Sequence, residues 1–173
     1  MEHEQHTRPG PSPAPSHALS APYVLEYTYR RSVGPVIGRF LGALKDGRIE
    51  GVRTRAGKVL VPPAEYDPET GESVLDETVE VGPSGVVTTW AWVMEPRRGQ
   101  PLDHPFAWAL VKLDGADTCM LHAVDAGSPE NMTTGMRVTP RWRAERAGEI
   151  QDIVCFERDA VSVERDARQR SAR

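Results

Sequence analysis

The segment from Gly57 to Gly71 constrains the fold most, because its two glycines stand where a pair of zinc knuckles would place them. Each knuckle of a structural zinc site needs two cysteines three residues apart, with a glycine directly after the second. The four ligand positions then fall on Arg53, Ala56, Asp67 and Thr70. None of them is Cys or His, so the sequence predicts a ribbon of two hairpins, with strands near 49–53 and 58–61, that binds no zinc.

Other residues in this segment can replace the metal. Asp67-Pro-Glu-Thr-Gly is good turn chemistry by itself. The Pro62-Pro63 pair removes freedom from the unfolded chain, while Val59, Val61 and Tyr66 offer apolar contacts. The second knuckle is therefore expected to persist as a turn.

A helix is predicted before the ribbon. Ser32 is a candidate N-cap, Pro35 fits a first turn, and the apolar periodicity ends near Gly47. Glycines at a spacing of four form a second stripe, and glycine in a helix costs up to about 1 kcal/mol relative to alanine. We therefore expect a partner to pack closely on this helix; the alternative is that the helix only covers its own barrel. The expected interface residues are Val33, Gly34, Val36, Ile37, Gly38, Phe40, Leu41, Gly42 and Leu44.

Strand patterns separated by turns follow from residue 73 onward, at the spacing of a small barrel. The expected strands are Ser73–Val81, Val86–Met94, Phe106–Leu113, Cys119–Asp125, Arg137–Glu145 and Asp152–Glu157. The fold class is thus mainly β, with an N-terminal helix, a ribbon without zinc and a small C-terminal barrel.

Five segments follow one another in a recognisable order: the helix Gly34-Pro-Val-Ile-Gly-Arg-Phe-Leu-Gly-Ala-Leu, the lead-in Asp46-Gly-Arg-Ile-Glu-Gly-Val-Arg, Val61-Pro-Pro, the strand Phe106-Ala-Trp-Ala-Leu-Val-Lys-Leu-Asp, and Thr134-Gly-Met-Arg-Val. This order resembles the zinc-ribbon plus OB-fold acyl-CoA-associated proteins over roughly residues 23 to 157, and it departs from the family pattern in the lost cysteines. The resemblance implies that the ribbon is a degenerate, rubredoxin-like ribbon without zinc and that the C-terminal barrel is an OB fold.

This resemblance implies a non-catalytic partner of a thiolase-fold enzyme. The Val-Pro-Pro-Ala-Glu-Tyr-Asp-Pro segment and the Thr-Thr-Trp-Ala-Trp strand are similar to the forms that pair with lipid-transfer-protein-like thiolases or steroid side-chain aldolases. The expected role is to complete the acyl-CoA channel and to stabilise the partner in a hetero-oligomer. No tightly bound cofactor is expected, and a coenzyme A thioester would be a shared substrate. A partnership with an acyl-CoA hydratase, and an independent acyl-CoA enzyme, are alternatives.

Charge disfavours another function of OB folds. Residues 23–157 hold 15 Lys and Arg against 20 Asp and Glu, and residues 64–80 hold seven acids and no base. Binding of single-stranded nucleic acid needs a positive groove along the phosphates. A nucleic-acid-binding module is therefore the less favoured alternative.

Two arginine pairs are the candidate ligand contacts. Arg97 and Arg98 lie in a long loop between two expected barrel strands, where OB folds present ligand-binding groups. Arg141 and Arg143 share one face of a later strand. Paired guanidinium groups suit phosphates, including those of coenzyme A. The alternative for both pairs is solvated surface charge.

No catalytic constellation stands out. His104 and His122 have no candidate nucleophile beside them, and Asp103 is only a sequence neighbour of His104. Cys119 and Cys155 lie in apolar runs and are expected to be buried free thiols.

The chain divides into five expected segments. Residues 1–22 form a disordered tail without a signal sequence, 23–47 the helical segment, 48–72 the ribbon, 73–157 the barrel and 158–173 a charged tail. No apolar stretch is long enough to span a bilayer, which predicts a soluble, cytoplasmic protein.

Overall fold

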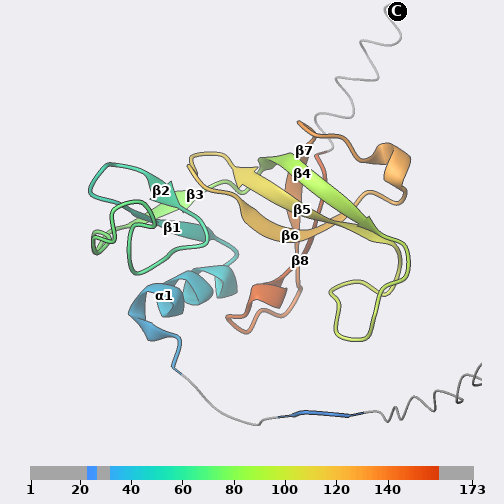
Figure 1. Cartoon of the computed structure of the whole chain (residues 1–173), viewed down its shortest axis with the longest axis horizontal. Helices are drawn as coiled ribbons and strands as arrows, with labels where there is room; N and C mark the ends of the chain where they lie inside the picture. Colours follow the sequence, from blue (N-terminus) through green and yellow to red (C-terminus); the bar gives the residue numbers. More distant parts are fainter. Residues whose placement is uncertain (1–22, 27–31, 160–173) are drawn as a thin grey trace, which may run out of the picture. The chain divides into compact units, whose positions relative to one another are not determined.

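The computed structural model describes residues 23–26 and 32–159. Residues 23–26 belong to a separate unit and form no regular secondary structure. The tail expected over residues 1–22 and the part of the C-terminal tail from residue 160 onward lie outside the described residues. From residue 32 onward the described chain is one helix followed by two β-structures (Figure 1).

Helix α1 spans Gly34–Lys45. The Ser32 hydroxyl accepts a hydrogen bond from the Gly34 N–H at 3.3 Å, but the capping position is Val33, one residue later than predicted. The helix ends because Gly47 takes a φ of +74°, which an L side chain disfavours. Its N–H then bonds to the Leu44 carbonyl at 2.9 Å.

The first sheet has three antiparallel strands in the order β2–β1–β3. Strand β1 (Ile49–Arg53) is central, flanked by β2 (Val59–Leu60) and β3 (Thr78–Val81). The strand predicted over residues 73–81 was assigned to the barrel, and that assignment is wrong. The observed strand β3 pairs with β1 instead, with Glu80 opposite Glu50.

The two predicted knuckles are present as turns. Gly57 and Gly71 have φ of +86° and +72°. The Gly57 N–H bonds to the Thr54 carbonyl at 2.9 Å, and the Gly71 N–H bonds to the Asp67 carbonyl at 2.8 Å. The Asp67 carboxylate also accepts the Glu69 N–H at 2.9 Å. Local turn chemistry is therefore kept at positions where a ribbon would use thiolates.

The second structure is a closed barrel in the order β4–β5–β6–β8–β7. All neighbours are antiparallel except β6 and β8. The five strands lie within a few residues of their predicted positions; the largest difference is that the fourth ends at Trp142 instead of Glu145. Their bounds are β4 Gly85–Val93, β5 Phe106–Leu113, β6 Met120–Asp125, β7 Arg137–Trp142 and β8 Ile153–Arg158.

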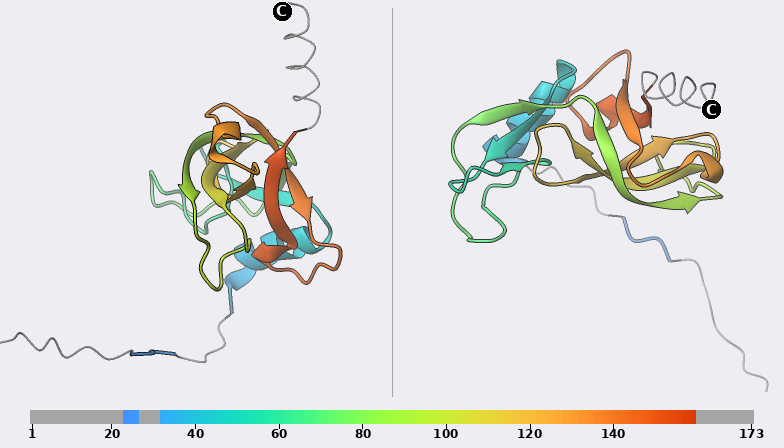
Figure 2. Two further views of the ribbon diagram at one scale, coloured as in Figure 1. Left: turned by 90° about the vertical axis from the view of Figure 1, so that its right-hand side faces the viewer. Right: turned by 90° about the horizontal axis from the view of Figure 1, so that it is seen from above.

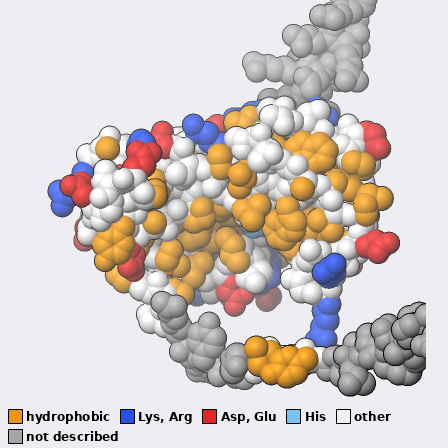
Figure 3. All heavy atoms as spheres, viewed as in Figure 1, with side chains coloured by type: hydrophobic (Ala, Val, Ile, Leu, Met, Phe, Trp, Pro, Cys, Tyr) orange, Lys and Arg blue, Asp and Glu red, His pale blue; other side chains and the backbone are white. Residues whose placement is uncertain are grey.

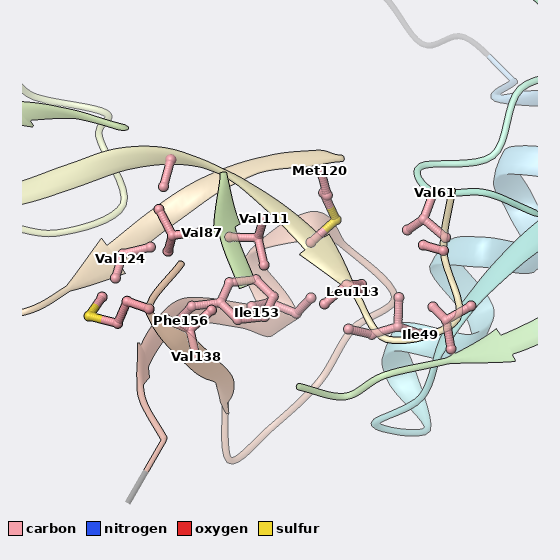
Figure 4. Packing of buried hydrophobic residues seen from close by; sticks show 14 of the residues in the cluster. Ile49, Val61, Val87, Val111, Leu113, Met120, Val124, Val138, Ile153 and Phe156 are labelled. Carbon is pink, nitrogen blue, oxygen red and sulfur yellow. The ribbon is translucent and has the colours of Figure 1, made fainter. Parts of the chain in front are cut away.

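One hydrophobic core joins the helix, the sheet and the barrel. Figure 4 shows Ile49 and Val61 beside the barrel residues Leu113 and Met120. Burial of apolar surface contributes roughly 25 cal/mol per Å², so this shared core holds the two β-structures together.

Polar contacts reinforce the junction. The Thr118 hydroxyl accepts the Val61 N–H at 2.7 Å and donates to the Val61 carbonyl at 2.9 Å. Beside it, the Val59 N–H bonds to the Asp117 carboxylate at 2.8 Å, and the Asp117 N–H bonds to the Val59 carbonyl at 2.8 Å. The β5–β6 turn thus satisfies backbone groups along the edge of β2 that does not face β1.

The barrel also contacts α1 through the loop between β7 and β8. This loop contains the short helix η2 (Ile150–Asp152), which lies against α1 (Figure 2). The Arg146 guanidinium donates to the Lys45 carbonyl at 2.9 Å. A second short helix, η1 (Pro129–Asn131), precedes β7. No helix in the described part of the chain is long and apolar enough to cross a membrane.

Candidate ligand-binding site

Two loops meet at one end of the barrel and define the candidate site. They are the β4–β5 loop (residues 94–105) and the β7–β8 loop (residues 143–152). In OB folds the equivalent loops, with the second and third strands, form the usual ligand-binding face. Here those strands are β5 and β6. Two adjoining depressions lie at the β4–β5 loop, and Gly99 and Pro101 of that loop line both.

The first depression, which we call the polar pocket, has a volume of about 590 Å³. Arg97, Arg98 and Arg141 line it together with His104. The structure therefore brings three of the four predicted arginines into one pocket. Arg97 and Arg98 are exposed, and neither forms an ion pair with any residue in the described ranges. Their charges are available to an anion.

Arg141 differs from this pair because acidic partners already hold its guanidinium. Nη1 lies 2.5 Å from Glu157 Oε1 and 3.5 Å from Asp125 Oδ2. Both contacts follow from strand neighbours, since Arg141 pairs with Cys155 and Asp125 pairs with Glu157. Arg141 therefore has less positive charge to offer a ligand than the sequence predicted.

His104 also belongs to this network. Its Nδ1 lies 3.2 Å from Asp103, and its Nε2 lies 3.1 Å from Asp125. Hydrogen bonds raise the pKa of His104 above its ordinary value of 6.5; the bond to Asp103 contributes most, followed by the bond to Asp125. The sequence shows only Asp103 beside His104. The contact with Asp125, which lies 21 residues away, could not be predicted because it depends on the fold of β6.

Cys155, Asp125 and Glu157 place three potential metal ligands within 4.8 Å of one another. However, the Arg141 guanidinium already bonds to both carboxylates. Burial raises the pKa of the Cys155 thiol to about 11, which keeps it protonated at neutral pH. A cation at the centre and a protonated thiol make this cluster unsuited to a metal ion. Cys119 and Cys155 are free thiols, as predicted, although Cys119 is only half-buried.

The second depression, which we call the apolar slot, opens between β6 and β8. These parallel strands pair only at Val124 with Phe156 and at Asp125 with Glu157. Ahead of those pairs the strands separate, and a pocket of about 390 Å³ remains. Its lining is mainly apolar and includes Trp108, Leu121, Ile150, Ile153 and Val154.

Two ionisable side chains, His122 and Arg143, line this slot. His122 is buried, stacks edge-to-face on Phe156 at 5.6 Å, and accepts the Ala123 N–H at 3.0 Å. Burial lowers the pKa of His122, so the imidazole is neutral at pH 7. The other is Arg143, which was predicted on a strand but lies just beyond β7; its guanidinium is 3.8 Å from Glu149.

The β7–β8 loop is held by one buried carboxylate. Asp152 accepts the backbone N–H groups of Ala147, Gly148 and Glu149 at 3.0, 2.7 and 3.1 Å. Burial by itself would raise the pKa of Asp152, but these three hydrogen bonds, together with the positive charge of Arg143, outweigh burial and lower the pKa. The wall of the slot that carries Arg143 and Ile150 is therefore fixed before any ligand binds.

Comparison with known proteins supports this description of the barrel. Residues 78–143 match the family described as ChsH2, C-terminal OB-fold domain. The barrel is an OB fold that is similar to this domain. The match begins with β3, continues through β4 to β7 with both arginines of the β4–β5 loop, and ends before β8.

Two solved structures share the architecture at low sequence identity. A chain of the "Ltp2-ChsH2(DUF35) aldolase" is 21% identical with a TM-score of 0.55, and the match covers 75% of this chain and 98% of that one. A DUF35-family protein of unknown function from Sulfolobus solfataricus is 18% identical with a TM-score of 0.55, and the match covers 73% and 85% of the two chains. No curated protein sequence matches the chain.

Outside the barrel, the predicted interface residues on and next to α1 fall into three groups by burial. Phe40 and Leu44 are buried in the chain's own core, which removes them from the expected interface. Gly38 and Gly42 are exposed, and a Cβ added at either would have no neighbour within 4 Å. Val33 is exposed. The remaining four are partly buried: Gly34, Val36, Ile37 and Leu41.

Proposed function

We propose that this protein is a non-catalytic accessory subunit of a thiolase-like aldolase. The observation that carries the proposal is the structural match to a chain of the "Ltp2-ChsH2(DUF35) aldolase", which extends over 98% of that chain. The family match of the barrel to the ChsH2 OB-fold domain supports the same assignment from sequence. The partner would be the aldolase subunit, in a hetero-oligomer.

The chemistry of the side chains favours an auxiliary role. His104 is held between two carboxylates, and His122 is buried beneath the slot without a nucleophile bonded to it. The Cys155 thiol is buried and protonated. A catalytic nucleophile is commonly activated by a base within hydrogen-bond reach. Among the described residues, neither histidine has such a nucleophile beside it. The catalytic groups would then belong to the partner.

This subunit would contribute to the acyl-CoA channel of the complex. Arg97 and Arg98 are exposed guanidinium groups in the β4–β5 loop of the barrel. They suit the diphosphate or 3′-phosphate of coenzyme A, because guanidinium and phosphate form charge-assisted hydrogen bonds. A role in lipid or steroid breakdown follows if the acyl group of the shared thioester is of that type.

Co-purification tests the assignment. A tagged full-length chain is isolated from its native host, and a bound thiolase-like aldolase is expected in stoichiometric amount. The isolated chain should show no aldolase, thiolase or hydratase turnover, whereas adding it should raise the activity or solubility of the aldolase. Turnover by the isolated chain, or a hydratase as the stoichiometric partner, would overturn the proposal.

A further inference from the structure

The apolar slot and the polar pocket lie side by side on the barrel and share two wall residues. Gly99 and Pro101 of the β4–β5 loop line both depressions. A ligand that crosses this wall would have one part among apolar side chains and another beside Arg97 and Arg98. The volume of the slot, about 390 Å³, is within the range of roughly 300 to 1,000 Å³ seen for small-molecule pockets.

The slot exposes apolar side chains to water in the isolated chain. Leu121 on β6 is 60% exposed and Ile150 on the opposite wall is 40% exposed. Figure 3 shows hydrophobic side chains gathered over the barrel. Each methylene group moved from water into such a site gains about 0.8 kcal/mol when it is fully buried. An alkyl chain or ring system would therefore bind here favourably.

Charge decides the class of ligand. The residues from 23 to 157 carry more acids than bases, yet Arg97, Arg98 and Arg143 stand around the two depressions. Of these, Arg143 has a partner at 3.8 Å, and Arg97 and Arg98 have no ion pair within the described ranges. His104 also lines the polar pocket, but Asp103 and Asp125 already hold its two ring nitrogens. The surroundings of the slot thus favour a ligand with a negatively charged end.

We propose that the apolar slot binds the apolar part of an amphipathic anion whose charged group lies on Arg97 and Arg98. This inference rests on the proposed function and deepens it, because an acyl-CoA thioester belongs to this class. It places the acyl group, or a portion of it, in the accessory subunit itself. The neutral imidazole of His122 beneath the slot adds no charge that would oppose an alkyl chain.

Ligand binding by the purified full-length chain tests this inference, with octanoyl-CoA and unacylated coenzyme A as probes in titration calorimetry. We expect octanoyl-CoA to bind at least about tenfold more tightly, which corresponds to about 1.4 kcal/mol. Replacing Arg97 and Arg98 with alanine should weaken both probes by a similar factor, because both carry the phosphates. Equal affinity for the two probes, or binding of neither, would overturn the inference.

A matched pair of variants locates the alkyl group. Leu121→Glu places a carboxylate in the slot and should reduce the affinity for octanoyl-CoA to about that for coenzyme A. Leu110→Glu is the control: Leu110 is the register partner of Leu121 on β5 and is 37% exposed, but it does not line the slot. Ile150→Glu, on the opposite wall, repeats the test from η2. Equal losses in the Leu110 and Leu121 variants would contradict the proposed location.

Assembly with the aldolase, measured on the same variants by size-exclusion chromatography, separates the two proposals. If the chain prefers octanoyl-CoA but no aldolase co-purifies, the inference stands and the proposed function fails. If the aldolase co-purifies but the chain shows no preference for octanoyl-CoA, the inference fails and the proposed function stands. In that second case, loss of assembly in Leu121→Glu would assign the slot to a side chain of the partner instead.

Discussion

The ammonium group of Lys58 lies 2.5 Å from Oε1 of Glu69, and this ion pair joins the two turns at which a zinc ribbon would hold its metal. Lys58 directly follows Gly57 of the first turn, and Glu69 is inside the second. The hydrogen bond to Glu69 raises the pKa of Lys58, so the ammonium group of Lys58 stays charged at neutral pH. Both side chains are largely exposed, and such pairs contribute little to stability. The turns must be held mainly by their backbone bonds and by the shared core.

The first prediction is that the protein folds without zinc. The four ligand positions are Arg53, Ala56, Asp67 and Thr70, and none offers a thiolate or imidazole. Elemental analysis of the purified chain should find far less than one zinc per chain, and chelators should leave the melting temperature unchanged. About one zinc per chain, or unfolding by a chelator, would contradict this prediction.

The second prediction concerns the junction between β2 and the barrel. Thr118→Val removes the hydroxyl that bonds to both the N–H and the carbonyl of Val61. Because a part-buried backbone group then loses its partner, we expect a loss of about 1 to 3 kcal/mol in the free energy of unfolding, measured with urea. Thr89→Val on β4 is the control, because Thr89 is exposed, and it should change stability little. Equal effects of the two variants would mean that the Thr118 bonds contribute nothing specific.

Local patterns in the sequence predicted the helix, the knuckle turns and the five barrel strands, because each depends on neighbouring residues. What the sequence could not predict lies where distant segments meet. Strand β3 was assigned to the barrel because nothing in its own residues reveals that it pairs with β1. The ion pairs of Arg141 could not be predicted because Glu157 and Asp125 come from other strands. The apolar slot was not predicted, since it depends on where β6 and β8 separate.

The third prediction is a dependence on pH through Asp152. Its pKa in the folded chain lies below the ordinary value of 3.8, so its carboxylate stabilises the native state fully above that value. This contribution is lost as the pH falls through the folded pKa. Asp152→Asn should therefore lower the free energy of unfolding at pH 7 by about 1 to 3 kcal/mol. In urea titrations the difference between variant and parent should shrink below pH 3.8; a difference that is constant with pH would show that the charge is not responsible.

The fourth prediction tests α1 as the partner interface. Gly38→Leu should leave the isolated chain folded, because Gly38 is exposed and an added Cβ meets nothing within 4 Å. Replacing a helical glycine should even stabilise α1, by up to about 1 kcal/mol. Assembly with the aldolase should weaken, since a bulky side chain would prevent close packing against the glycine stripe.

Arg39→Leu serves as the control for that experiment. It adds the same side chain at an exposed position of α1 that is turned by roughly 100° from Gly38. The surface ion pair of Arg39 with Asp76 that is lost contributes little to stability. Binding of the aldolase to each variant is compared by pull-down with increasing partner concentration. Assembly that is unchanged in Gly38→Leu would show that this face of the helix points into solvent in the complex as well.

The last prediction concerns Arg97 and Arg98 in the assembled complex. A charge-assisted hydrogen bond contributes about 1.5 to 3 kcal/mol when well formed and less when solvated. Replacing both arginines with alanine should therefore raise KM for acyl-CoA by roughly tenfold or more, since about 1.4 kcal/mol corresponds to one decade. The change in kcat should be small, because these groups would bind a part of the substrate remote from the reacting carbon. The matched control replaces Arg55 and Lys112, which are exposed but do not line either depression. KM should be compared at low salt, where charge effects are largest. An unchanged KM in the variant without Arg97 and Arg98 would assign the pair to solvated surface. Of the four predicted arginines, Arg143 would then remain as the one that could contact coenzyme A without first breaking a close ion pair.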